Sequence, residues 1–391
     1  MRQSVNTYIP GFTGLRGVAA FGVFLVHYNQ IVLLDPVWGP FDLYELLANG
    51  EYGVALFFSL SGFLLSLPYW QSKRYETPLP RTINYACKRI VRVTPAYFFA
   101  VTVLLIFYNH WAIPGAWSDI LLHYSFLFNL VEFSIFSLNP SFWTLAVEMQ
   151  LYCLVPVFFY LAHRSSIYIS LATLAITAAL SYLVHCVLIN AVTQVVLWPL
   201  DERLTWIRVN GAVLNYSLLA HLPHFAIGAF TAFFFLQLNE SRKKRPLLVQ
   251  KGSEVFFWAV SCLLLILLAA PDFLSALQIP HGRYGLPLIA LLMGGLLLAL
   301  PFTTYAVRLF EWGPIKMFGV LSYGFYLFHH PILQWADRGM AEVHLNAPDY
   351  PLIFVLVSFC LATLAAFFTY ICIERPVLVL WKKKKRLYVP L

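Results

Sequence analysis

Long apolar runs separated by short polar segments extend along the whole chain. Ten of these runs approach the roughly 20 residues that a membrane-spanning helix needs. They lie at about 12–34, 51–70, 95–112, 142–163, 166–189, 214–238, 255–272, 284–302, 317–336 and 350–375. The longest polar stretches between them are 71–94, 190–213 and 239–254. The pattern predicts an all-α, polytopic transmembrane helical bundle in one membrane domain, 1–380, followed by a basic cytoplasmic tail, 381–391.

An eleventh apolar segment, 119–138, contains four polar residues, Asp119, His123, Asn129 and Glu132. Positive charges decide whether it crosses, because cytoplasmic loops of membrane proteins are enriched in Lys and Arg. With ten crossings and both termini in the cytoplasm, all but four of the 26 Lys and Arg residues fall on the cytoplasmic side. An eleventh crossing would place the downstream basic loops outside. We therefore predict that 119–138 is interfacial or re-entrant.

The composition agrees with a membrane protein and excludes several other classes. Of the 391 residues, 60% are hydrophobic and 11% are charged, whereas soluble domains carry about 25% charged residues. Topology explains the net charge of +8, so no nucleic-acid partner is expected. The six cysteines form no C-x-x-C pair, and we predict no metal site. Arg16 interrupts the first run and no cleavage site follows, so we expect a retained helix.

Few ionisable residues lie inside the predicted helices, and each is a candidate for function because burying one in a bilayer costs about 2.5–3.5 kcal/mol. They are His27 in the first run, Glu148 in the fourth, and His329 with its neighbour His330 in the ninth. Histidine suits proton transfer near neutral pH, and a nearby carboxylate would orient its ring. Proton relays in transporters use the same residue types, so a transporter or flippase without group transfer remains an alternative.

Arg16 lies eleven residues before His27. On a helix this spacing returns to the same face after a rise of about 16 Å. The arrangement suits a long substrate that is held by its anionic end near the membrane surface and reacts at depth. A snorkelling arginine and a histidine hydrogen-bonded to a neighbouring helix explain the spacing equally well.

A second group of cations, Lys88, Arg89 and Arg92, lies in the run KRIVR of the 71–94 loop. Arg89 and Arg92 would share a helical face, and their planar guanidinium groups suit phosphate oxygens. With Lys88 and Arg16 they would form an anion pocket at the cytoplasmic surface. Attraction to anionic lipid headgroups is the alternative, and it explains the other basic clusters, 242–245 and 382–386.

Six motifs together resemble acyltransferase family 3, the polytopic membrane acyltransferases that modify cell-surface carbohydrates and some small molecules. The resemblance runs from about residue 10 to 380 and keeps the family's motif order. The motifs are GLRGVAAFGVFLVHY, FFSLSGFLL, the basic R-x-x-R, SFWTLAVEMQLYCLVP, SYGFYLFHHP and IERP. Each is weak alone, but six in order are specific.

The resemblance implies a role for each candidate cation and for the first histidine. His27 is similar to the family's essential first-helix histidine, and Arg16 to its partner. In the implied reaction His27 is the general base that deprotonates the acceptor hydroxyl, or alternatively it accepts the acyl group itself. Arg89 and Arg92 match the R-x-x-R that is linked with the nucleotide of acyl-CoA.

The resemblance also covers the two later candidates. Glu148 matches the glutamate of SFW-x-LAVE, and His329 the histidine of YL-x-H-x-P. The sequence departs from the family at Met149, where many relatives carry an acidic or polar residue, and at His330, which often has an aromatic counterpart.

The function implied is an integral membrane O-acetyltransferase in a bacterial inner membrane. Its donor would be cytoplasmic acetyl-CoA, with no permanently bound cofactor, and its acceptor a hydroxyl of a carbohydrate or glycolipid such as lipopolysaccharide O-antigen or exopolysaccharide. Direct delivery is expected, without the fused esterase domain of some relatives. A lipid or macrolide-like acceptor is the alternative within the same enzyme class. Acceptor contacts are expected in 190–213, from Trp198, Asp201, Trp206 and Arg208.

Overall fold

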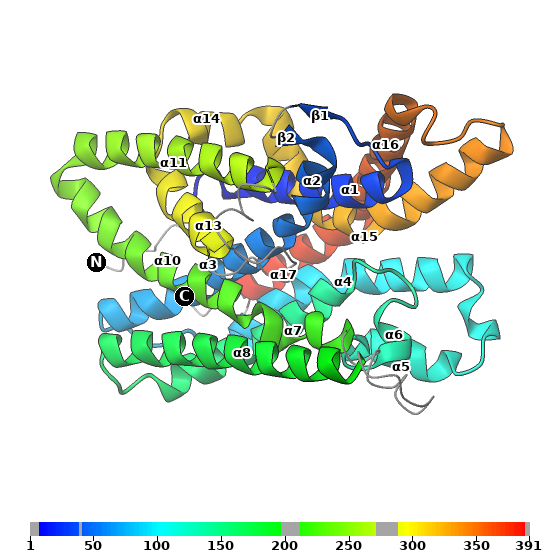
Figure 1. Cartoon of the computed structure of the whole chain (residues 1–391). Helices are drawn as coiled ribbons and strands as arrows, with labels where there is room; N and C mark the ends of the chain where they lie inside the picture. Colours follow the sequence, from blue (N-terminus) through cyan, green and yellow to red (C-terminus); the bar gives the residue numbers. More distant parts are fainter. Residues whose placement is uncertain (1–7, 39–40, 197–211, 271–287, 388–391) are drawn as a thin grey trace. The chain divides into compact units, whose positions relative to one another are not determined.

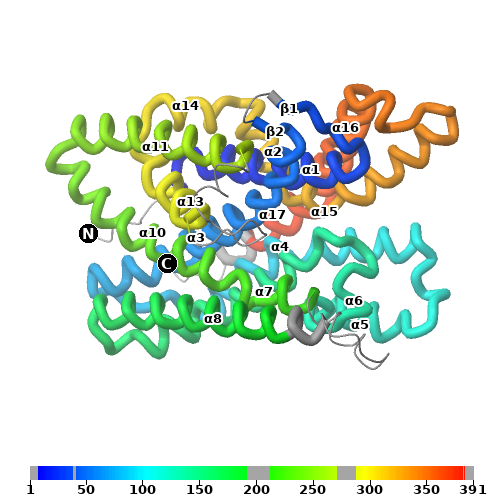
Figure 2. Tube along the Cα trace, in the orientation of Figure 1, coloured from blue at the N-terminus to red at the C-terminus, as the bar shows by residue number. Residues whose placement is uncertain are grey.

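The computed structural model describes residues 8–38, 41–196, 212–270 and 288–387, which are almost entirely helical (Figures 1 and 2). Strands within these ranges are limited to an antiparallel pair, β1 (Val37–Trp38) and β2 (Phe41–Asp42). The α-helices are α1 (Phe12–Val32), α2 (Leu43–Ala48), α3 (Tyr52–Arg74), α4 (Thr82–Phe107), α5 (Ala116–Ser125), α6 (Glu132–Ile135), α7 (Trp143–Leu161), α8 (Ile167–Val196), α10 (Leu218–Lys244), α11 (Pro246–Ala269), α13 (Leu288–Ala299), α14 (Tyr305–Phe310), α15 (Gly313–Glu342), α16 (Pro351–Thr369) and α17 (Arg375–Leu387). Short 3-10 turns are η1 (Asn49–Glu51), η2 (His110–Ala112), η3 (Phe128–Leu130) and η5 (Leu300–Phe302), and η6 (Tyr370–Glu374) is a π-helical turn.

The predicted all-α polytopic bundle is confirmed. In the described part of the chain, seven helices are long and apolar enough to cross a membrane: Leu43–Arg74, Thr82–Phe107, Trp143–Leu161, Ile167–Ala191, Ala212–Lys244, Pro246–Ala269 and Pro351–Trp381. The three remaining predicted runs coincide with α1, with α13 and η5, and with α15. The segment 119–138 is broken into α5, η3 and α6, in agreement with the prediction that it is not a spanning helix.

Several predicted boundaries are wrong. The stretch 239–254 is nearly all helical, because α10 ends at Lys244 and α11 begins at Pro246. The stretch 71–94 was expected to be a loop, but α4 already begins at Thr82 and ends at Phe107 instead of reaching 112. The early start has a physical reason, because the residues before Pro95 are amphipathic at helical spacing, with Tyr85 and Val93 buried and the cations turned outward or half-buried. The run KRIVR therefore lies on a helix that continues into the membrane.

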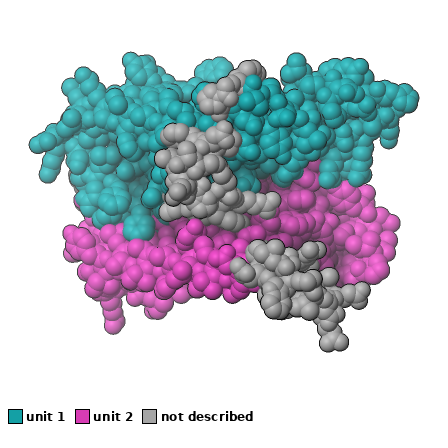
Figure 3. Space-filling view, viewed as in Figure 1, with its two compact units in different colours: residues 1–67, 227–325, 332–361 teal, residues 68–226, 326–331, 362–391 magenta. Residues whose placement is uncertain are grey.

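The structure divides into two compact units, each assembled from segments that are far apart in the sequence (Figure 3). Unit 1 contains residues 1–67, 227–325 and 332–361. Unit 2 contains residues 68–226, 326–331 and 362–391. Candidate residues in unit 1 are Arg16 and His27, and those in unit 2 are Lys88, Arg89, Arg92, Glu148 and His329.

In unit 1, glycines let α1 approach its neighbours at backbone distance. A Cβ atom added to Gly319 of α15 would lie 1.9 Å from the carbonyl oxygen of Thr13, and one added to Gly14 would lie 2.1 Å from that of Phe310. Close approach of this kind replaces the hydrophobic driving force that lipid removes from helix association in membranes. The N-terminal half of α1, which carries Arg16, is thus held against α14 and α15.

Replacing Gly319 by Ala should therefore destabilise unit 1, since the backbone of Thr13 can yield only if α1 moves. Overpacking of this kind costs about 1–3 kcal/mol. Gly339→Ala on the same helix is the matched control, because nothing lies within 4 Å of its added Cβ and Ala favours a helix by about 1 kcal/mol over Gly. We expect the melting temperature in detergent to fall by several degrees for Gly319→Ala only. Equal melting temperatures would contradict the close packing of α1.

In unit 2, aromatic contacts and one lysine fix α7 relative to the end of α3. Trp70 meets Phe159 edge-on, with ring centroids 4.9 Å apart. Lys73 Nζ donates to the carbonyl oxygens of Ala162, over 2.7 Å, and of Ser165. The last carbonyls of a helix have no intrahelical donor, so a lysine at this position stabilises the C-terminal end of α7.

Candidate functional site

A polar stripe follows one face of α7 in unit 2. It consists of Ser141 in the turn before the helix, Thr144, Glu148 and Tyr152, which succeed one another in steps of three or four residues. Residues at this spacing lie on the same helix face. Most other residues of α7 are apolar, and polar groups gathered on one face of a membrane helix indicate a functional surface. We call these four residues the α7 stripe.

Helix α4 places Arg89 at the Tyr152 end of the α7 stripe. Tyr152 Oη donates to Glu148 Oε1 over 2.6 Å. The Cζ atom of Arg89 lies 5.7 Å from the ring centroid of Tyr152 and 5.7 Å from that of Tyr85, a cation–π distance for both rings. A cation, two aromatic rings and a carboxylate are thus joined in one cluster. Arg89 is half-buried, and its neighbours in the run are exposed: Lys88 and Arg92.

Around Arg89, three buried donors lack acceptors. The rings of Tyr69 and Tyr85 meet edge-on, with centroids 6.0 Å apart. Among the described residues, none supplies a hydrogen-bond partner to Arg89 Nε, Tyr69 Oη or Tyr85 Oη, although all three atoms are shielded from solvent. A buried donor without an acceptor costs about 1–3 kcal/mol. An anion with several oxygens, such as a phosphate, would satisfy donors grouped in this way.

The other end of the α7 stripe is fixed to α15 through a consequence of Pro331. This proline has no N–H, so the carbonyl of Leu327, four residues earlier, lacks its usual helical donor. Asn139 Nδ2 donates to that oxygen over 3.0 Å, while Asn139 Oδ1 accepts from the backbone N–H of Ser141, also over 3.0 Å. The proline creates the acceptor that fixes Ser141 beside α15.

Tyr326 and His329 of α15 complete this end. Thr144 Oγ1 donates to Tyr326 Oη over 2.9 Å, and Tyr326 Oη donates to the carbonyl of Ser141 over 3.0 Å. His329 Nδ1 lies 2.8 Å from the carbonyl oxygen of Tyr326. Because a carbonyl only accepts, Nδ1 carries the proton and Nε2 carries the lone pair. Nε2 lies 3.5 Å from Ser141 Oγ, so His329 is the histidine that meets the α7 stripe, while the adjacent His330 is half-buried.

In unit 1, Arg16 and His27 lie on one uninterrupted helix, α1, as predicted. Both side chains are half-buried. His27 Nδ1 lies 3.0 Å from Gln30 Oε1. An amide oxygen only accepts, so this contact assigns the proton to Nδ1 and the lone pair to Nε2. The ring therefore has the tautomer that a general base acting through Nε2 needs.

A cluster that the sequence did not predict anchors the start of α1. Glu311 accepts from the backbone N–H of Gly11 over 2.7 Å, accepts from Tyr8 Oη, and pairs with Lys316 Nζ at 2.6 Å. Burial alone would raise the pKa of Glu311, but hydrogen bonds from Lys316, Tyr8 and Gly11 outweigh it and lower the pKa below its ordinary value. The carboxylate thus stays charged and holds the helix that positions Arg16.

A second unpredicted cluster ties together the segment 108–142 of unit 2, which contains α5, η3 and α6. His110 Nε2 lies 2.6 Å from Asp119 Oδ2, Ser134 Oγ donates to Asp119 Oδ1, and His123 Nε2 lies 2.9 Å from Ser137 Oγ. His123 also stacks on a phenylalanine, Phe128. All but Ser137 of the polar members are buried. Because this segment leads directly to Ser141, the cluster helps to position the start of the α7 stripe.

This cluster predicts a loss of stability in acid. Burial lowers the pKa of His123 to about 4, although the Asp119 carboxylate opposes the shift. An unfolded histidine takes up its proton near pH 6.5, so between about pH 6.5 and 4 the unfolded chain binds more protons than the folded one. The melting temperature should therefore fall through this range. In His123→Gln the fall should be smaller, whereas the exposed control His163→Gln should follow the unsubstituted protein. Parallel curves for all three proteins would contradict the role of His123.

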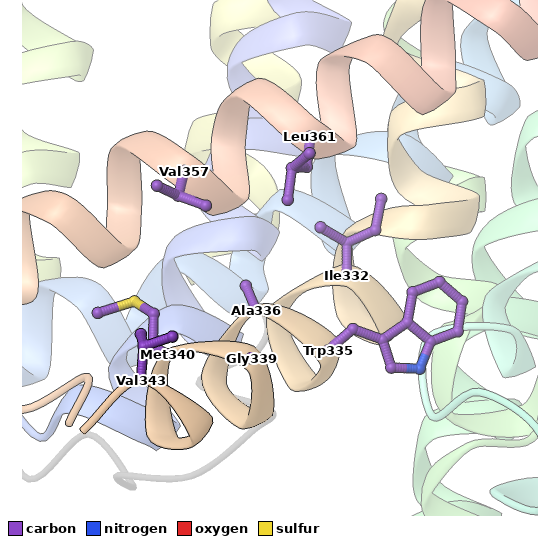
Figure 4. Close-up of a pocket in the computed structure, with 8 residues that line it drawn as sticks. All are labelled: Ile332, Trp335, Ala336, Gly339, Met340, Val343, Val357 and Leu361. Carbon is purple, nitrogen blue, oxygen red and sulfur yellow. The ribbon is translucent and has the colours of Figure 1, made fainter. Parts of the chain in front are cut away.

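An apolar cavity of about 440 Å³ lies in unit 1 and contains none of the candidate residues. Figure 4 shows Val357 and Leu361 of α16 facing Ile332, Ala336 and Met340 of α15 across it. Apart from Trp335 the lining is aliphatic or Met and fits hydrocarbon, and it contains no charged side chain. Within the described ranges, no group of three or more His, Cys, Asp or Glu residues could hold a metal ion.

The structure thus gathers the predicted residues into separate groups. Arg89 and Glu148 are brought together through Tyr152, and His329 joins the other end of the same stripe. The predicted anion pocket of Arg16 with the α4 cations, and the predicted approach of His27 to Glu148, join residues of different units and stay predictions. The expected acceptor residues lie outside the described residues: Trp198, Asp201, Trp206 and Arg208.

Comparison with known proteins gives one match that covers nearly the whole chain. A family model described as "Acyltransferase domain" matches residues 9–372. Curated relatives include O-acetyltransferase OatA of Staphylococcus aureus strains NCTC 8325 / PS 47, COL and MRSA252, each 30% identical over 100 residues. The aligned part is 26% of this chain and 14% of each relative. No solved structure gives a significant match.

Proposed function

Because this chain belongs to the acyltransferase family that the match over residues 9–372 defines, we propose that it is a membrane O-acetyltransferase. It moves an acetyl group from cytoplasmic acetyl-CoA to a hydroxyl of a cell-surface carbohydrate or glycolipid, such as lipopolysaccharide O-antigen or exopolysaccharide, and works in a bacterial inner membrane. The name of the OatA relatives supports acetyl as the group and oxygen as the acceptor atom.

The observation that carries the proposal is the α7 stripe with a cation cluster at one end and a histidine at the other. Arg89 lies against Tyr152, Tyr152 bonds to Glu148, and Ser141 meets His329. Polar groups in a bilayer cost free energy. A row of polar side chains along one helix face therefore indicates a path for a polar reactant. The positive charges around Arg89 belong to the cytoplasmic side by the topology rule, which is where acyl-CoA is available.

The donor would be held by its phosphates. Three buried donors have no hydrogen-bond acceptor among the described residues: Arg89 Nε, Tyr69 Oη and Tyr85 Oη. The oxygens of a phosphate group would accept hydrogen bonds from them. Lys88 and Arg92 are exposed on the same helix and would meet the remaining charge of the nucleotide. Arg16 of unit 1 adds a further cation. Membrane lipids are the other partner, bound by the apolar helix surfaces.

The chemistry assigns one role to each candidate. His27 acts as the general base that removes the proton of the acceptor hydroxyl. Glu148 supplies a negative charge that stabilises the cationic form of a histidine, and His329 positions the reacting groups at the other end of the α7 stripe. Holding both reactants in one orientation supplies much of the rate.

Acetyl transfer by the purified protein tests the proposal. Protein in detergent or nanodiscs is incubated with acetyl-labelled acetyl-CoA and three acceptors: a lipid-linked glycan, a simple lipid alcohol and a macrolide. Label on the glycan is expected. Label on the lipid or the macrolide would identify that molecule as the acceptor in place of the glycan. If no acetyl group is transferred and no acetyl-CoA is consumed, the protein is not an acetyltransferase and a transporter is favoured.

Replacing Arg89 by Ala should weaken use of the donor more than the reaction itself. A charge-assisted hydrogen bond to phosphate is worth about 1.5–3 kcal/mol, so KM for acetyl-CoA should rise by about 10- to 100-fold with kcat within about threefold. Arg164→Ala is the control, because Arg164 is an exposed arginine of the same unit. An unchanged KM in Arg89→Ala would exclude this arginine from donor binding.

A further inference from the structure

We propose that Ser141 is a nucleophile activated by His329, so that the acyl group passes through an acyl-serine on the protein. The inference rests on the proposed function, because it needs an acyl-CoA donor. It adds a covalent step and gives His329 a definite chemical role.

The two side chains have the relation of a nucleophile to its base. Ser141 Oγ lies 3.5 Å from His329 Nε2, and Nδ1 of the same ring donates to the carbonyl of Tyr326 over 2.8 Å. A hydroxyl next to a histidine whose other nitrogen is oriented by a third group is the arrangement of activated serine nucleophiles. Such distances are often long without substrate and shorten in the reacting complex. Ser141 is 3% exposed and His329 0%, so water does not compete for either group.

Hydrogen bonds fix the backbone around both residues. Asn139 bridges the Leu327 carbonyl and the Ser141 N–H, and Tyr326 Oη donates to the Ser141 carbonyl. Both main-chain polar groups of Ser141 are thereby linked to α15. A nucleophile has to be held in place against its base, and these contacts do so.

The position along α7 fits a donor that enters from the Arg89 end. Tyr152, which Arg89 contacts, lies eleven residues after Ser141. On a helix this corresponds to about 16 Å. An extended pantetheine arm is long and thin, so a nucleotide bound at Arg89 would present its thioester towards Ser141.

The proposed reaction has two steps. First, Ser141 Oγ attacks the thioester carbon, the O–C bond forms, the C–S bond breaks, and the serine proton passes to His329 Nε2 while CoA leaves as its thiolate. Second, the acceptor hydroxyl attacks the acyl-serine. The new O–C bond forms, the bond to Ser141 Oγ breaks, and Oγ leaves with the proton that His329 kept. The acceptor proton passes through a base and solvent to the CoA thiolate, which completes the balance.

Isotope exchange without an acceptor distinguishes this route from direct transfer. An acyl-enzyme that forms reversibly must move the acetyl group between acetyl-CoA and added radiolabelled CoA, whereas a direct transfer cannot do so. We expect the purified protein to catalyse this exchange. We also expect an acetyl group, about 42 Da, on the peptide that contains Ser141 after rapid acid quenching.

Three serine variants complete the test. Ser141→Ala should lower exchange by about 100-fold or more, while Ser141→Cys, which keeps a nucleophile of similar size, should carry the acetyl group as a thioester. Ser125→Ala is the control, because Ser125 is exposed on α5 and bonds to a carbonyl of its own helix. The melting temperature of each variant shows whether it is folded.

The possible failures are distinct. Acetyl transfer to an acceptor without exchange, or exchange at the normal rate by folded Ser141→Ala, would overturn the acyl-serine and leave the proposed function intact. If the unsubstituted protein shows neither transfer nor exchange, the proposed function is wrong and the role of Ser141 with it.

Discussion

Replacing His27 by Ala is expected to lower acetyl transfer by about 10²- to 10⁴-fold, the usual contribution of a general base. The half-buried ring is fixed on α1 by its contact with Gln30, which leaves the lone pair on Nε2. Removal of the ring takes away the proton acceptor and its contact with Gln30. The variant should therefore insert, fold and bind acetyl-CoA with an unchanged affinity, and the loss should appear in kcat.

The controls for His27 separate chemistry from stability. His163→Ala removes an exposed histidine just after α7 and should leave kcat unchanged. His27→Gln keeps a polar side chain of similar length without the basic nitrogen, so it should be as inactive as His27→Ala. Near-normal transfer by either purified variant, at a melting temperature close to that of the unsubstituted protein, would show that another group is the base.

Helices were the most predictable part of this chain, because long apolar runs in a bilayer have to satisfy their own backbone groups. The start of α4 was missed for a physical reason. Arg81 immediately precedes it and its first turns carry Lys88 and Arg89. A hydropathy pattern excludes such a stretch from the membrane without deciding whether it is helical. The amphipathic spacing of Tyr85 and Val93 contained the missing information.

Candidate residues were predictable one by one, but their partners were not. Ionisable groups are rare in apolar runs, so Glu148 and His329 can be identified as candidates from the sequence alone. The contacts of Ser141 with His329 and of Asn139 with Leu327 join segments 188 residues apart, and only packing brings these together. One sequence feature did indicate the contact with Leu327. Pro331 leaves the Leu327 carbonyl without a helical donor, so that carbonyl needs a donor from another segment.

The clusters around Glu311 and Asp119 show a different limit. Their acidic residues lie outside the spanning helices. Charged residues are common there, so the sequence alone does not mark these two as unusual. Only the structure shows that Asp119 is buried between His110 and His123. Both clusters support the site from a distance, because one anchors the helix that carries Arg16 and the other the segment that leads to Ser141.

Glu148 offers the second large expected effect. Glu148→Gln removes the negative charge and keeps the size of the side chain, so it should lower kcat by about 100-fold with a small change in KM. Tyr152→Phe removes the donor of the 2.6 Å hydrogen bond to Glu148 and should lower kcat by about tenfold. Steady-state rates of the purified variants with saturating acetyl-CoA measure both effects.

The double variant tells how Tyr152 acts. If its hydroxyl works only by orienting the Glu148 carboxylate, Tyr152→Phe should cost almost nothing in the Glu148→Gln background, and the two losses will not add. Tyr160→Phe is the matched control, because Tyr160 is an exposed tyrosine of the same helix. Fully additive losses would mean that Tyr152 contacts the substrate itself, since two groups that act through one carboxylate cannot be independent.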